Sequence, residues 1–260
     1  MVGRGVVTMA VRPPLRGDNP NSVSHGTSTF LFLLGCAGRG SGFGEGRVMT
    51  LLEPDVALTD FGLAAECALF AGWLYARAPA GKPVLGWFMI LFAALGIGAL
   101  LGGITHGFLG DPQSVAYRVV WVATLLAIGV VALASWAIGA HLLFTGSGAQ
   151  RVLLLAGVLF ALYTVVVLFF SQSFAVAVIN YVPAAAFALA AFVLTYVRRR
   201  AATMLPGIAG LLLTFTAAAI QQGGIALPAL GLTHNALYHL VQALALLLIF
   251  LTARGLAQEA

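Results

Sequence analysis

The residues best suited to chemistry in this chain lie at the start of its last apolar segment, where positions 233–239 read Thr-His-Asn-Ala-Leu-Tyr-His. At about 100° per residue, a helix places Asn235 and His239 one turn apart and Gln242 within about 20° of Asn235. The three side chains therefore form one polar stripe, with His234 beside it. Such a stripe either binds a metal ion or hydrogen-bonds to neighbouring helices.

A second histidine ends another apolar segment, in which Ala94, Gly98, Gly102 and His106 recur at every fourth position. Small residues at this spacing allow two helices to approach closely. Helices of opposite direction would bring His106 and His239 into the same layer. We predict a metal site there, with zinc as the metal and His106 and His239 as ligands. Asp60, Asn235 or His234 is expected to complete the shell.

Other polar side chains are predicted to face the same layer. Ionisable groups are costly inside a membrane and usually face the interior of the bundle, so each is a candidate functional residue. The candidate catalytic residues are Asp60, Arg118 and Tyr238. For the metal site, the alternative is a hydrogen-bond network that holds the helices together without a metal.

The elements that must position these residues are membrane-spanning helices. Of the 260 residues, 61% are hydrophobic and 8% charged, and the mean hydropathy is +1.01. Soluble domains carry about 25% charged residues, so a soluble globular protein is excluded. Because the links are short, neighbouring helices must be antiparallel, which predicts an all-α polytopic seven-helix bundle. The predicted spans are 56–76, 84–106, 116–143, 152–170, 174–197, 204–221 and 235–254.

Basic residues predict how the bundle is oriented. They gather at the first, third and fifth links and the C-terminal end, as Arg77, Lys82, Arg151, Arg198, Arg199, Arg200 and Arg254. The other links contribute only Arg118. The positive-inside rule then places the C-terminus in the cytoplasm and the N-terminus outside. We expect a multi-pass protein of the cell (plasma or inner) membrane, in contact with membrane lipid and with a lipid or small-molecule ligand.

Residues 1–48 differ in composition from the rest of the chain. They are rich in Gly, Arg, Ser and Pro, which predicts a disordered tail, and the abrupt change at Met49 favours Met49 as the natural start of a 49–260 domain. Five of the thirteen basic and two of the eight acidic residues lie in this tail, so the remainder carries only +2 and gives no support for nucleic-acid binding. We also expect no retinal, because the only lysine, Lys82, lies in a link and not in the last helix.

The two histidine-bearing segments, Gly102-Gly103-Ile104-Thr105-His106-Gly107 and His234-Asn235-Ala236-Leu237-Tyr238-His239, resemble the CREST superfamily. That superfamily comprises seven-helix membrane proteins, among them alkaline ceramidases and progestin and adipoQ receptors. The resemblance implies a zinc-dependent lipid amide hydrolase in which a water on the metal is the nucleophile. This chain has Gly102 where the superfamily has a serine, and Asn235 where it has the first histidine of a His-x-x-x-His pair.

Two other functions remain open at this stage. One is a small-molecule or proton-linked transporter or receptor that uses Asp60, His106, Arg118 and His239 for binding and relay. No inverted repeat is detectable in the sequence, which argues against a transporter. The other is a structural membrane subunit whose partner supplies the chemistry.

Overall fold

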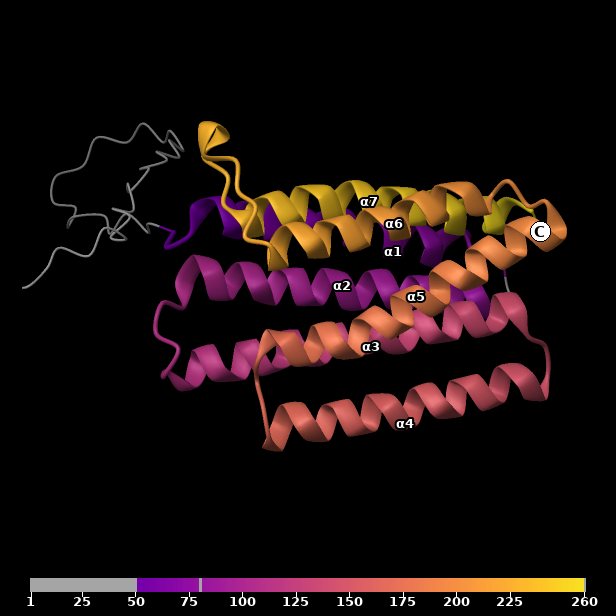
Figure 1. Cartoon of the computed structure of the whole chain (residues 1–260), viewed down its shortest axis with the longest axis horizontal. Helices are drawn as coiled ribbons and strands as arrows, with labels where there is room; N and C mark the ends of the chain where they lie inside the picture. The colour runs from indigo at the N-terminus through magenta and orange to yellow at the C-terminus, as the bar shows by residue number, and fades with distance from the viewer. Residues whose placement is uncertain (1–50, 80, 260) are drawn as a thin grey trace, which may run out of the picture. The chain divides into compact units, whose positions relative to one another are not determined.

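A computed structural model describes residues 51–79 and 81–259, so the predicted tail over 1–48 and the start at Met49 lie outside the described residues. Seven long helices make up nearly all of the described chain (Figure 1). They are α1 (Pro54–Arg77), α2 (Pro83–Phe108), α3 (Val115–Leu143), α4 (Ser147–Phe169), α5 (Phe174–Arg199), α6 (Met204–Gln222) and α7 (His234–Gln258), and a short 3-10 turn, η1 (Pro228–Leu230), lies between α6 and α7.

All seven helices are long and apolar enough to cross a membrane. The prediction of an all-α protein with seven spans is therefore confirmed, and the chain is a multi-pass membrane protein by the length and composition of its helices. Each predicted span lies within the corresponding helix to within one residue.

Local residue types explain where the helices begin. Pro54 and Pro83 stand at the first positions of α1 and α2, where a helix needs no backbone N–H donor. The hydroxyls of Ser114, Ser173 and Thr233 accept hydrogen bonds from the first-turn N–H groups of α3, α5 and α7. Five of the seven helices therefore begin with a proline or with a capping hydroxyl.

Packing orders the helices within the bundle. α1 packs on α2, α2 on α3, α3 on α5 and α6 on α7, and α1 also packs along α7. Figure 1 shows α4 at the edge of the bundle, where its main contact is α3. The three helices that carry the candidate metal ligands, α1, α2 and α7, are consequently in mutual contact.

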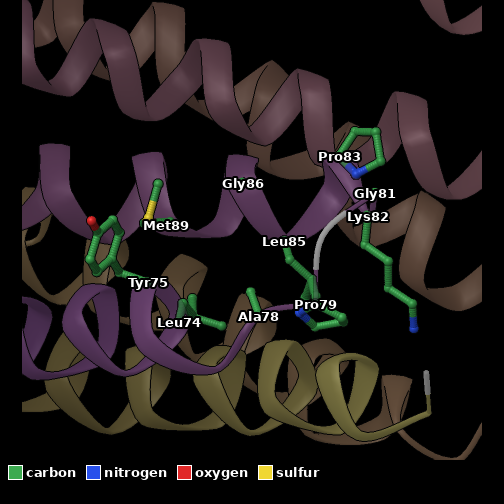
Figure 2. Close-up of a pocket in the computed structure, with 10 residues that line it drawn as sticks. All are labelled: Leu74, Tyr75, Ala78, Pro79, Gly81, Lys82, Pro83, Leu85, Gly86 and Met89. Atoms are coloured by element: carbon green, nitrogen blue, oxygen red, sulfur yellow. The ribbon is translucent and has the colours of Figure 1, made fainter.

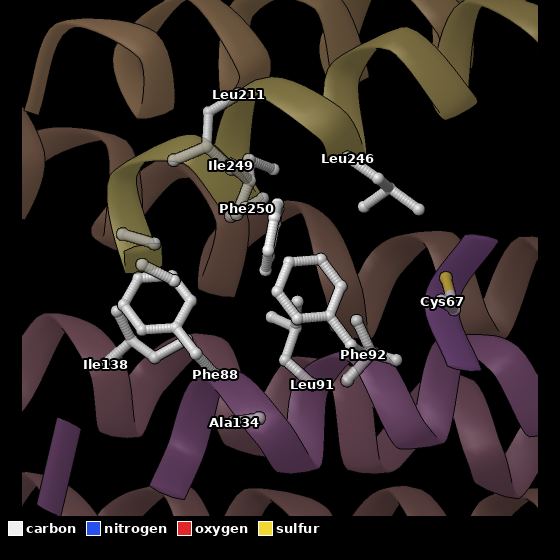
Figure 3. Packing of buried hydrophobic residues seen from close by; sticks show 14 of the residues in the cluster. Cys67, Phe88, Leu91, Phe92, Ala134, Ile138, Leu211, Leu246, Ile249 and Phe250 are labelled. Carbon is white, nitrogen blue, oxygen red and sulfur yellow. The ribbon is translucent and has the colours of Figure 1, made fainter. Parts of the chain in front are cut away.

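The buried centre of the bundle is built from aromatic and aliphatic side chains (Figure 3). Phe70 of α1 stacks on Phe250 of α7 with ring centroids 4.2 Å apart, and Phe92 of α2 meets Phe250 edge-on. Lipid chains are as apolar as these side chains, so close packing and dispersion, not exclusion from water, stabilise the contacts.

Candidate functional site

Three helix ends meet where α1 begins, and we call this region the His239 end of the bundle. The backbone N–H groups of Leu52 and Glu53 donate to the carbonyl oxygens of Gly107 and His106 at the end of α2, both at 3.1 Å. The Asp55 carboxylate accepts from the backbone N–H and the hydroxyl of Thr233, at 3.0 and 2.8 Å. The first turn of α1 is thereby tied both to the end of α2 and to the start of α7.

The His239 imidazole is held by α1. Its Nδ1 lies 3.2 Å from Thr59 Oγ1, and that hydroxyl lies 2.8 Å from the Asp55 carbonyl and 2.9 Å from the Val56 carbonyl. Either carbonyl can accept the single hydroxyl hydrogen of Thr59. When the hydroxyl donates to a carbonyl, the Nδ1–H of His239 donates to Thr59 Oγ1, which leaves the lone pair on Nε2.

That lone pair faces a buried carboxylate. His239 Nε2 lies 3.3 Å from Asp60 Oδ1, and Asp60 is 3% exposed. The other oxygen, Asp60 Oδ2, is buried and has no hydrogen-bond partner within the part of the chain that the structure describes. Two lone pairs facing each other repel, so the contact requires a shared proton or a bound cation between them.

The helix α2 makes room for this carboxylate. A Cβ added at Gly102 would lie 3.1 Å from Asp60 Oδ2 and 3.2 Å from Oδ1, so the glycine is what allows the close approach. His106 follows one turn later on the same face of α2. Its Nδ1 lies 3.0 Å from Glu53 Oε2, with the two side chains 26% and 54% exposed. His106 is therefore at the rim and His239 in the interior of the same end.

The remaining predicted site residues are less closely associated. His234 and Asn235 are half-buried in the first turn of α7, and the Tyr238 ring packs beside that of His239 with centroids 4.9 Å apart. Arg118 is exposed at the start of α3 and forms no ion pair with any described residue. Gln242 belongs to a different contact, because its amide donates to Thr214 Oγ1 of α6 at 3.3 Å.

Sequence reasoning found the histidines and Asp60 but missed Glu53 and Thr59. These two residues fix the orientation of the imidazoles, yet a glutamate before a helix and a threonine within one are unremarkable in sequence. Across residues 51–79 and 81–259, no group of three or more His, Cys, Asp or Glu side chains is close enough to hold a metal ion as it stands. The described residues instead form two pairs of such side chains, Glu53–His106 and Asp60–His239.

Comparison with known protein families shows to which family the chain belongs. Residues 56–258 match the model of DUF6962, a family of unknown function. The chain belongs to DUF6962. The matched region runs from the first turn of α1 to the end of α7, so the helices of the His239 end are part of the DUF6962 region. No curated protein and no solved structure matches the chain.

Proposed function

We propose that the His239 end binds a divalent metal ion, with zinc as the first candidate, and that the protein is a CREST-type hydrolase of a lipid amide. The observation that carries the proposal is the orientation of both imidazoles. His106 and His239 each use Nδ1 on an oxygen, of Glu53 and Thr59 respectively, which leaves both Nε2 atoms as available ligands. Metal-binding histidines are almost always held in this way.

The donor set is suited to zinc. His239 Nε2 and Asp60 would supply two ligands, and their 3.3 Å separation is close to the roughly 3.4 Å expected between two ligands of a tetrahedral zinc ion. His106 Nε2 would be the third after a movement of the side chain at the rim. A zinc ion would polarise the amide carbonyl and supply a nucleophilic water.

The chain's own residues would do the positioning. Thr59 and Glu53 hold the imidazoles, and Asp60 Oδ2 remains as a buried acceptor for a proton. Arg118, exposed at the same end of the bundle, is placed to attract an anionic lipid headgroup.

Metal analysis of the purified protein tests the proposal. We expect one equivalent of metal in the wild type and its loss in both His106→Ala and His239→Ala. His141→Ala is the matched control, because His141 lies in the last turn of α3, at the opposite end of the bundle. A wild-type protein without metal after purification in zinc-containing buffer would refute the proposal. If metal is present, ceramide-like amides are the first substrates to assay.

We further propose that the His239 end faces outward from the cell (plasma or inner) membrane and that the C-terminus lies in the cytoplasm. The support is the distribution of charge. The end of the bundle opposite the His239 end, which we call the basic end, carries most of the basic side chains of the described chain, and the His239 end contributes only Arg118.

A second function is favoured by the Asp60–His239 contact itself. Without a metal, this pair shares one proton inside the bundle, which is the arrangement a proton-linked transporter or receptor needs. Proton uptake by metal-free protein in liposomes, abolished by Asp60→Asn, would support this function instead of hydrolysis.

A further inference from the structure

The basic end contains a pocket between α1 and α2 that is independent of the proposed metal centre. It has a volume of about 360 Å³, and its lining includes Leu74 and Tyr75 of α1, Gly86 and Met89 of α2, and Pro79 and Lys82 of the link. Volumes above about 300 Å³ are typical of ligand sites. Figure 2 shows Tyr75 and Met89 at one end of the pocket and Lys82 with the link at the other.

The two ends of the pocket differ in chemistry along the membrane normal. Lys82 precedes the first residue of α2 and therefore lies at the membrane surface, whereas Leu74 and Met89 lie at greater depth. Lys82 Nζ donates to the carbonyl of Leu256 in the last turn of α7 at 2.9 Å. Among residues 51–79 and 81–259 this is the one hydrogen bond of the ammonium, so two of its three N–H donors have no partner there. The pocket thus combines a surface cation with an apolar interior.

The charge of the basic end indicates which kind of ligand the pocket binds. At the basic end, Arg77 ends α1, Arg254 is in the last turns of α7 and Arg198, Arg199 and Arg200 end α5, whereas Glu259 is the one acidic residue of the described chain there. A positive surface of this kind attracts anionic headgroups.

We propose that this pocket binds one anionic phospholipid, with its phosphate on Lys82 and the upper part of an acyl chain against Tyr75 and Met89. Glycine at position 86 keeps the pocket open. A Cβ added at Gly86 would meet no atom within 4 Å, so a larger side chain there enters the pocket without a clash.

The test is lipid binding by the purified full chain, measured by native mass spectrometry with phosphatidylglycerol and phosphatidylcholine of identical acyl chains. One surface cation contributes roughly a fivefold preference for the anionic lipid. We expect this preference in the wild type and its loss in both Lys82→Gln and Gly86→Leu. Gly86→Leu keeps the lysine and its bond to Leu256, so it separates pocket occupancy from any structural role of Lys82.

Two matched controls complete the experiment. Gly157→Leu places the same side chain at an equally open glycine of α4, and Arg198→Gln removes a charge from the basic end away from the pocket. Both should keep the wild-type preference. Equal loss in Arg198→Gln would indicate diffuse attraction and overturn the proposal, as would a Gly86→Leu variant that still prefers phosphatidylglycerol. Displacement of the lipid by millimolar inorganic phosphate alone would also overturn it, because the acyl chain would then contribute nothing.

Discussion

At the scale of single residues, the space left by Gly102 decides whether Asp60 can remain against His239. An alanine at position 102 would place its Cβ 3.1–3.3 Å from three atoms of the Asp60 carboxylate, which is buried and already in contact with His239. Gly98→Ala is the control, since its Cβ would make an ordinary 3.6 Å contact with Ala127. We expect Gly102→Ala to be less stable than Gly98→Ala by about 1–2 kcal/mol in thermal unfolding in detergent. Equal stability would mean that the carboxylate is free to move.

Thr59 has a role that can be separated from packing. Thr59→Val keeps the shape of the side chain but removes the oxygen that lies 3.2 Å from His239 Nδ1. Loss of such a partner typically lowers metal affinity by about 10- to 100-fold, and we expect a decrease in that range in a chelator competition titration. Thr105→Val is the control, because the Thr105 hydroxyl donates only to the Leu101 carbonyl of its own helix. An unchanged metal affinity in Thr59→Val would show that Thr59 does not contribute to the metal site.

The sequence predicted the candidate ligands better than the residues that orient them. Asp60, His106 and His239 stand out because ionisable groups are rare in apolar segments. Glu53 and Thr59 do not stand out, since their role depends on which helices lie side by side. The polar stripe predicted on α7 does not act as one group either. His239 contacts α1, whereas Gln242 contacts α6.

At the scale of helices, the bond between Asp55 and Thr233 holds the start of α7 against α1. Asp55→Ala would leave the backbone N–H of Thr233 without this acceptor, at a cost of about 1–2 kcal/mol. We expect faster hydrogen exchange in the first turn of α7, measured by mass spectrometry. Asp111→Ala removes a carboxylate at the same end that bonds only within its own link, and it should leave α7 unchanged.

The spacing between α6 and α7 depends on Gly210. A Cβ at this position would lie 2.6 Å from the Ala245 carbonyl oxygen, a backbone atom that cannot turn away. Gly210→Ala should therefore lower the stability of the protein in detergent by about 1–3 kcal/mol. Gly157→Ala, at an open glycine on α4, should be neutral or stabilising, and a neutral Gly210→Ala would show that the two helices can separate without cost.

The sequence predicted which segments form helices, but it did not predict which helices lie next to each other. Apolar length defines a span, so each predicted span lies within its helix to within one residue, although α4 begins at Ser147, before the predicted start at 152. The peripheral place of α4 has no such signal. A helix surrounded by lipid and a helix surrounded by protein are both apolar, so composition does not distinguish them.

At the scale of the whole molecule, the proposed orientation can be measured directly. Gln113 lies in the α2–α3 link at the His239 end, and Ser147 begins α4 at the basic end; both are exposed. In a background with Cys36→Ser and Cys67→Ala, we expect a membrane-impermeant maleimide to label Gln113→Cys in intact cells and Ser147→Cys only after lysis. The reverse pattern would invert the topology and place the proposed metal centre on the cytoplasmic side.

The contact of α1 with α7 has a consequence for biosynthesis. The first helix leaves the ribosome six helices before the last, so Asp60 enters the membrane long before His239 exists to meet it. Until translation is complete, the nascent chain carries an uncompensated carboxyl group within its first span. A product truncated anywhere before α7 keeps that carboxyl group without its His239 partner.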